Sequence, residues 1–121
     1  MLSLVFYKTI HFLGVFALIT ALTASLARAS AGVGGAEGDP WRKRLAIAHG
    51  VALFLVLLGG FGMLARLGMS VTGWVGAKLL LWIAVGGLIA LRKSPAAAGW
   101  GLVLVPVLAA LAGWIGYTKP F

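Results

Sequence analysis

Four long apolar runs occupy most of this 121-residue chain and constrain its fold more than any other feature. They extend over about residues 4–27, 45–65, 74–91 and 97–117. An α-helix rises about 1.5 Å per residue, so each run is long enough to cross the ~30 Å hydrocarbon core of a bilayer. None of the runs alternates between apolar and polar residues, as barrel strands do. Because backbone groups in lipid must hydrogen-bond within their own segment, we expect four transmembrane helices.

The composition agrees with a membrane protein and excludes a soluble enzyme or a disordered chain. Hydrophobic residues make up 62% of the chain and charged residues 10%, and the mean hydropathy is +1.09. Soluble domains contain about 45–50% apolar and about 25% charged residues. The chain has no cysteine, which excludes disulfides and sites that need a thiolate.

Short segments connect the four runs, at about residues 28–44, 66–73 and 92–95. The first of these is rich in glycine and contains Pro40, which is typical of non-helical chain. Short connections make consecutive helices antiparallel neighbours. We therefore predict one all-α membrane domain over residues 1–121, with four transmembrane helices in an antiparallel up-down bundle.

The net charge of +8 is distributed unevenly between the connections. Cytoplasmic loops of membrane proteins carry an excess of Lys and Arg. The first and third connections contain six basic residues, namely Arg28, Arg42, Lys43, Arg44, Arg92 and Lys93. The opposite side has Arg66 and Lys119, with Lys8 near the end of the first run. We predict a multi-pass membrane protein with both termini on the outer side, which in a bacterium is the periplasm, and with its basic loops in contact with the lipid bilayer. No nucleic-acid partner is expected, because the chain lacks a water-exposed basic module.

Ionisable side chains inside a membrane are costly, and each one therefore suggests a function. Counted from the outer side, His11 is roughly 10 Å deep and Lys78 roughly 6 Å deep, and Lys8 lies one turn before His11. We expect these three residues to converge as a candidate catalytic or cofactor-binding site. The alternative is that both lysines reach water at the ends of the helices and that His11 only hydrogen-bonds between helices.

The second histidine, His49, lies near the inner side of the membrane. It is separated from His11 by about 10–15 Å along the membrane normal, so a haem held by both histidines is not expected. The runs contain no Asp, Glu or Cys, so we expect no separate metal site.

Small residues recur along the runs and predict close contacts between helices. Ala17, Ala21 and Ser25 form one stripe at four-residue spacing, and glycines at 59, 60 and 62 narrow the second helix. Pro106 in the fourth run is expected to kink that helix, because it removes one backbone hydrogen bond.

Short motifs lie at the starts of three runs and at the end of the chain. Tyr7-Lys-Thr-Ile-His11 opens the first helix, His49 begins the second, Trp74-Val-Gly-Ala-Lys78 opens the third, and Thr118-Lys-Pro follows the fourth. This arrangement resembles the SirB family of small four-helix bacterial inner-membrane proteins. Gly50-Val51 stands where that family commonly carries Asp-Thr. The resemblance implies a fold more than an activity. Because the chain has small-residue faces and little mass outside the membrane, we expect a SirB-like, non-enzymatic accessory or interaction subunit of a larger membrane complex.

The early histidine and the Trp-x-x-x-Lys motif are also similar to the HemJ-type protoporphyrinogen oxidases. In that family these positions are tied to haem b and to catalysis, which implies these roles for His11 and Lys78. The family's Arg-Leu-x-x-Tyr-His run after the first helix is not present here. The alternative function is therefore a haem- or quinone-dependent membrane oxidoreductase that uses His11 and Lys78, with Lys8 beside them.

Overall fold

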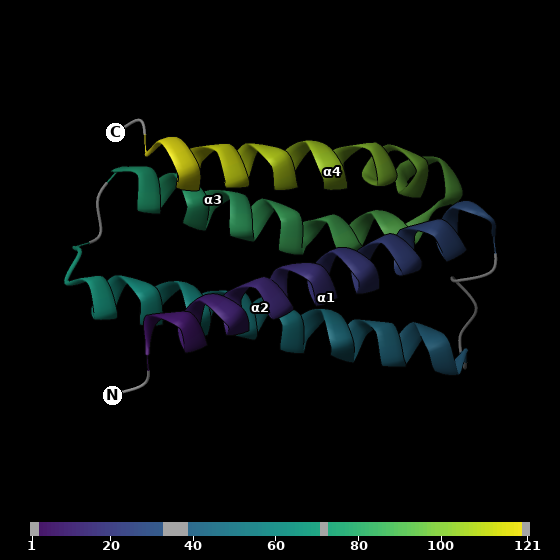
Figure 1. The fold of residues 1–121 in the computed structure, drawn as a ribbon. Coiled ribbons are helices and arrows are strands. Elements are labelled where there is room, and N and C mark those ends of the chain that lie inside the picture. Colours follow the sequence, from purple (N-terminus) through teal and green to yellow (C-terminus); the bar gives the residue numbers. More distant parts are fainter. Residues whose placement is uncertain (1–2, 33–38, 71–72, 120–121) are drawn as a thin grey trace.

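In this computed structural model, which describes residues 3–32, 39–70 and 73–119, four long helices account for nearly all of the described chain (Figure 1). They are α1 (Leu4–Ser30), α2 (Pro40–Leu67), α3 (Gly73–Gly87) and α4 (Pro95–Thr118), with the 3-10 helix η1 (Leu88–Lys93) between the last two. Each of α1, α2 and α4 is long and apolar enough to cross a membrane, and so is α3 together with η1. The described residues contain no strand. The prediction of an all-helical chain with four helices of membrane-spanning length is confirmed.

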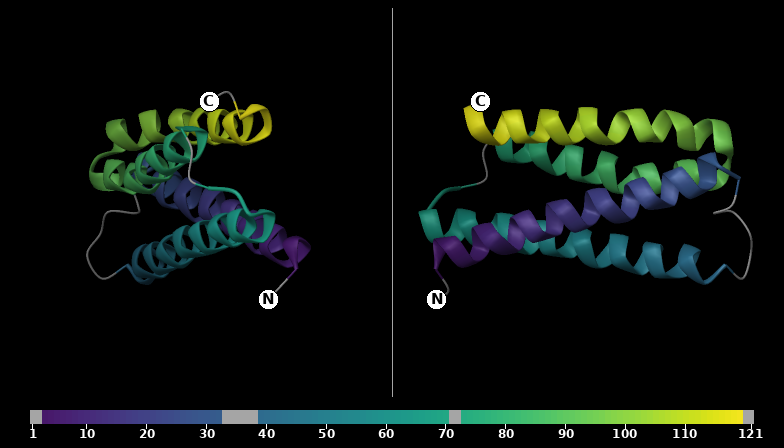
Figure 2. Two further views of the ribbon diagram at one scale, coloured as in Figure 1. Left: turned by 90° about the vertical axis from the view of Figure 1, so that its left-hand side faces the viewer. Right: turned by 45° about the vertical axis from the view of Figure 1, so that its right-hand side comes forward.

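The four helices lie side by side, and each runs opposite to the one before it in the chain (Figure 1). The start of α1 and the end of α4 are consequently at the same end of the molecule. At that end, α1 and α2 diverge from α3 and α4, whereas at the other end α1 packs against η1 and α4 (Figure 2). Helix α1 thus provides most of the packing between the two halves of the structure, while Trp82 Nε1 of α3 donates to the Leu53 carbonyl of α2 at 3.0 Å.

Glycines allow α1 and α2 to approach each other almost backbone to backbone. A Cβ atom on Gly59 would lie 2.5 Å from the backbone nitrogen of His11, and one on Gly14 would lie 2.6 Å from the backbone nitrogen of Val56. Side chains do not tolerate contacts this short, so only glycine fits at either position. This is the packing expected of helices in lipid, where small residues and close backbone contact replace the hydrophobic effect.

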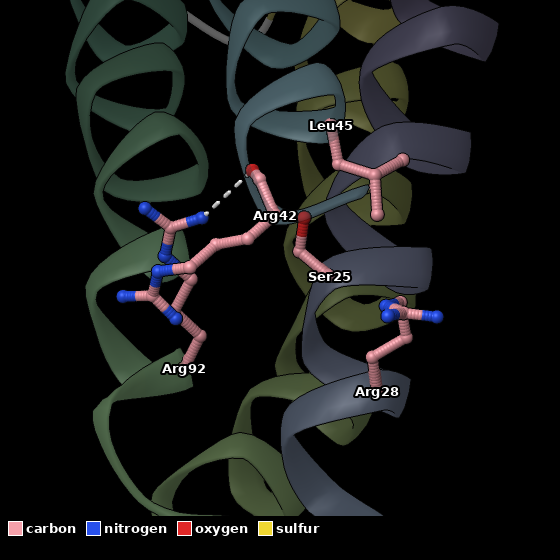
Figure 3. A pocket seen from close by; sticks show the side chains of 5 residues that line it. All are labelled: Ser25, Arg28, Arg42, Leu45 and Arg92. Carbon is pink, nitrogen blue, oxygen red and sulfur yellow. Dashed lines mark hydrogen bonds between the residues drawn. The ribbon is translucent and has the colours of Figure 1, made fainter. Parts of the chain in front are cut away.

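The apolar core lies where the second half of α1 meets η1 and α4. Leu22, Leu26 and Val105 are its largest fully buried side chains. The whole core consists of Leu18, Leu22, Leu26, Ala29, Ala52, Val85, Leu88, Ala98 and Val105. Two residues of the predicted small-residue stripe, Ala21 and Ser25, are also buried, and Ser25 lies where α1 faces the start of α2 (Figure 3).

The helices extend beyond the predicted runs, and the largest difference, at the start of α2, has a local chemical reason. Helix α2 begins at Pro40 rather than near residue 45, because the Asp39 side chain accepts a hydrogen bond from the Trp41 nitrogen and Pro40 occupies the first turn. The third predicted helix continues to Lys93, but its last part is the tighter η1. Helix α4 continues through Pro106 without an interruption of its helical assignment.

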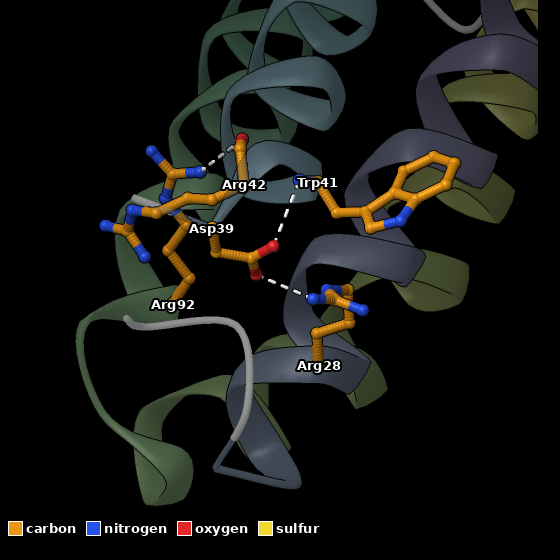
Figure 4. Close-up of polar contacts among 5 residues, drawn as sticks. All are labelled: Arg28, Asp39, Trp41, Arg42 and Arg92. Atoms are coloured by element: carbon orange, nitrogen blue, oxygen red, sulfur yellow. Dashed lines mark hydrogen bonds and ion pairs between the residues drawn. The ribbon is translucent and has the colours of Figure 1, made fainter. Parts of the chain in front are cut away.

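An ion pair links the end of α1 to the start of α2 (Figure 4). Arg28 Nη2 donates to Asp39 Oδ2 at 2.6 Å, while Asp39 Oδ1 accepts from the Trp41 backbone. One carboxylate therefore caps α2 and holds α1 at the same time. The hydrogen bond from Arg28 lowers the pKa of Asp39 below its ordinary value of 3.8.

We predict that Gly59→Ala destabilises the protein by about 1–3 kcal/mol, which is the usual cost of overpacking a tight contact. The added methyl group would meet the backbone of His11. Thermal unfolding in detergent micelles, followed by circular dichroism, measures the loss. Gly50→Ala is the matched control in the same helix, because a Cβ there meets nothing within 4 Å in the part of the chain that the structure describes. Equal destabilisation by both substitutions would contradict the packing argument.

The contribution of Asp39 to stability should depend on pH. Because folding lowers its pKa, this contribution is complete above the ordinary Asp value and is lost as the pH falls through the lowered folded-state value. Asp39→Asn keeps a capping oxygen but removes the charge. The free energies of unfolding of the wild type and of this variant, measured from about pH 7 down to about pH 3, should converge as the pH decreases. A difference in the free energy of unfolding that stays constant over this pH range would show that the ion pair does not stabilise the fold.

Candidate functional site

A groove of about 690 Å³ lies at the end of the bundle that holds the start of α1 and the end of α4. At this end the α1–α2 half diverges from the α3–α4 half (Figure 2). The first part of α1, the last parts of α2 and α4, and most of α3 form its walls. Most of the lining residues are apolar, including Trp74 and Trp82. Sites for small molecules and cofactors typically measure about 300–1,000 Å³ and have largely apolar walls. The groove therefore has the size and the character of a ligand site.

The three candidate site residues, Lys8, His11 and Lys78, all line this groove. Lys8 and His11 lie one turn apart on α1, and Lys78 comes from α3 across the groove. Lys119, directly after α4, lines the same space. The fold thus brings together four ionisable side chains from the first, third and fourth helical segments.

The imidazole of His11 is held by the neighbouring helix. Its Nδ1 lies 2.8 Å from the carbonyl oxygen of Val56. Since a carbonyl only accepts hydrogen bonds, Nδ1 carries the proton and donates it, and a neutral ring then has its lone pair on Nε2. Histidines that bind metals are commonly fixed in this way, with one ring nitrogen donating to a backbone carbonyl and the other binding the metal.

The lysines of the groove lie close to the backbone of α4. The Lys78 side chain passes over Gly116, where a Cβ would lie 2.8 Å from its Nζ. Lys119 Nζ donates to the Gly116 carbonyl oxygen at 3.0 Å and lies 5.3 Å from the centre of the Trp74 ring. At that distance the ammonium group is attracted to the face of the indole. Gly116 is therefore the position on α4 where both lysines fit.

The positive charge of the groove has no carboxylate partner among the described residues. The chain contains two acidic residues, Glu37 and Asp39, and both belong to the connection between α1 and α2. Asp39 pairs with Arg28 at the opposite end of the bundle. A ligand with anionic groups would supply the missing partners for Lys8, Lys78 and Lys119.

His49 lies outside this site. Its side chain is only 5% exposed, and it does not line the groove. Its Nε2 is buried without a hydrogen-bond partner in the described part of the chain. The two histidines therefore serve different regions of the bundle.

Two features of the site were not anticipated from the sequence. Lys119 was counted only as a charge beyond the last helix, although its depth places it on the same side as Lys78. The hydrogen bond between His11 and the Val56 carbonyl could not be predicted from any sequence pattern, because this backbone acceptor reaches His11 only when α1 and α2 are packed.

No family model, curated protein or solved structure matches this chain. The resemblances based on short motifs stay predictions, and the function has to be inferred from the groove and the residues that line it.

Proposed function

We propose that the chain is a multi-pass protein of the bacterial inner membrane, inserted as an antiparallel up-down bundle with both termini in the periplasm. The lengths of the four helices support insertion. So do the large apolar side chains on the outside of the bundle, such as Val5, Leu80 and Trp100, which are 72%, 70% and 73% exposed. In water these would form an aggregation-prone surface, whereas in lipid they are solvated. The basic first and third connections support the orientation.

We further propose that the groove binds a haem-type ligand, as the resemblance to HemJ-type oxidases implies. The observation that carries this proposal is the meeting of His11, Lys78 and Lys8 in one apolar groove of about 690 Å³. The Nε2 atom of His11 is suited to hold a haem iron, and the lysines are suited to pair with propionate groups. The apolar walls would cover the faces of the macrocycle. A bound haem would supply redox chemistry, while the protein would set its position and exclude water.

A quinone is the alternative ligand for the same groove, and the state of His11 argues against it. Quinone carbonyl oxygens need hydrogen-bond donors, whereas a neutral His11 already donates its single N–H to the Val56 carbonyl. The lysines of the groove would have to hold the head group without it. A haem uses the lone pair that His11 retains, so the donor set fits haem better.

A second candidate function is a SirB-like accessory or interaction subunit of a larger membrane complex. Gly50, Gly76 and Gly87 favour it, because each lies on a helix surface where a Cβ would meet nothing within 4 Å among the described residues. Such positions admit the close approach of a partner helix in a membrane. By contrast, Gly14 and Gly59 are already used for packing within the chain.

Hemin titrated into the protein in mild detergent should produce a saturable Soret band. Substitution His11→Ala should weaken binding by about tenfold or more, since it removes the proposed axial ligand. Added imidazole should restore the band in this variant, which a merely structural role of His11 would not produce. His49→Ala is the matched control and should bind like the wild type.

The same titration separates the other possibilities. Trp74 and Trp82 line the groove, so quenching of tryptophan fluorescence reports any ligand there, including a short-chain ubiquinone. Saturable quenching by the quinone but not by hemin would identify a quinone, and not haem, as the ligand of the groove. A protein that binds neither and migrates with a larger complex on a native gel would support the subunit function instead.

An alkaline phosphatase domain fused to the C-terminus should be active in bacterial cells, because the phosphatase works only in the periplasm. A green fluorescent protein fused at the same position should not fluoresce when exported in unfolded form. The opposite pair of results would place Lys119 in the cytoplasm and invert the proposed orientation. A fusion within the connection between α1 and α2, before Pro40, is the matched control: its phosphatase should be inactive and its fluorescent protein should fluoresce.

A further inference from the structure

The end of the bundle opposite the groove contains a cluster of arginines around one serine (Figure 3). Arg28 from α1, Arg42 from α2 and Arg92 from η1 line a shallow depression together with Ser25 and Leu45. We call Ser25, Arg28, Arg42 and Arg92 the arginine cluster. Its members come from three segments of the chain, so it exists only in the folded protein.

The cluster has an excess of positive charge. Arg28 pairs with Asp39, and Arg92 Nη1 donates to the backbone oxygen of Arg42 at 3.4 Å (Figure 4). The guanidinium groups of Arg42 and Arg92 lie near each other and repel. The whole chain has only two acidic residues. Even if both carboxylates were close to the cluster, they would not balance the charge of its three guanidinium groups.

Two buried polar atoms of the cluster have no hydrogen-bond partner in the described part of the protein. Ser25 is only 5% exposed, and neither its Oγ nor the Nε of Arg28 has a hydrogen-bond partner among the described residues. A serine inside a helix commonly bonds a carbonyl of the preceding turn, but Ser25 does not. Buried groups of this kind are rare and call for an explanation such as a bound ligand. Both atoms can donate, and donors beside cations suit an oxyanion.

We propose that the arginine cluster binds a phosphate group. A guanidinium matches two phosphate oxygens at once, and the Ser25 hydroxyl supplies a further donor. Because the depression is shallow and the Ser25 Oγ is buried, the phosphate would lie over its mouth and reach the hydroxyl once the long arginine side chains shift around it. The source is either an anionic lipid headgroup or a soluble phosphate.

The surroundings of the cluster favour a lipid as the source. Trp41, beside the cluster, is 51% exposed, and the guanidinium of Arg44 lies 5.3 Å from the centre of its ring. Exposed tryptophan next to basic residues is typical of the membrane interface. The cytoplasmic leaflet, where the proposed orientation places this end, is rich in anionic lipids. The phosphate site itself rests on the cluster and not on the groove or its ligand.

Phosphatidylglycerol titrated into the detergent-purified protein and followed by native mass spectrometry tests the site. The apparent affinity should fall about tenfold in Arg92→Gln, which loses a charge-assisted hydrogen bond. It should also fall severalfold in Ser25→Ala, which keeps every charge and tests the site even if Arg92→Gln does not fold. Lys93→Gln is the matched control and should bind like the wild type, since Lys93 is adjacent and exposed but does not line the depression.

Inorganic phosphate, tested by thermal stabilisation and by competition with the lipid, separates the two sources. Stabilisation by phosphatidylglycerol that millimolar phosphate does not reproduce identifies a lipid headgroup. Stabilisation by phosphate alone, lost in Ser25→Ala, identifies a soluble ligand and supports the same site. An equal loss of lipid binding in Lys93→Gln and Arg92→Gln would overturn the proposal, because it would reveal only a diffuse attraction between charges. No effect of either probe would overturn it as well.

Discussion

The close contact between α1 and α2 at Gly14 and Gly59 is the interaction on which the rest of the structure depends. Helices in lipid gain little from burying apolar side chains against each other, so their association relies on backbones that approach closely. Here that approach puts the Nδ1 of His11 within hydrogen-bonding distance of the Val56 carbonyl. Because of this contact, the first half of α1 packs against α2. The buried core that α1 shares with η1 and α4 is formed by its second half. The groove lies beside the first part of α1, where that helix packs against α2.

The polar chemistry is divided between the two ends of the bundle. At one end, three lysines and His11 line an apolar groove without a carboxylate in the described structure. At the other end, three arginines surround a buried serine, and Asp39 serves mainly to join α1 to α2. In both places basic groups outnumber acidic ones, because the chain has ten basic residues and two acidic ones. The two proposed ligands, a haem-type molecule at one end and a phosphate group at the other, would both supply negative charge that the described side chains lack.

Much of the fold and part of the site were predictable from simple geometry. The apolar runs specified four helices, because lipid allows few other ways to satisfy a backbone. Counting residues from the ends of the runs placed Lys8, His11 and Lys78 at similar depth, and the three do line one groove. The start of α2 was missed because Asp39 caps the helix through its side chain and lets it begin at Pro40, outside the apolar run.

The sequence by itself determined the number of helices, their approximate limits and the side of the bundle on which each charge lies, since these follow from length, hydropathy and the rise of a helix. Only the tertiary structure decided which charged groups meet. The hydrogen bond between His11 and Val56, the return of Lys119 to Trp74, and the gathering of arginines around Ser25 depend on how each helix is rotated about its axis. That rotation is set by contacts such as those at Gly14 and Gly59, and these contacts form between helices, not within them.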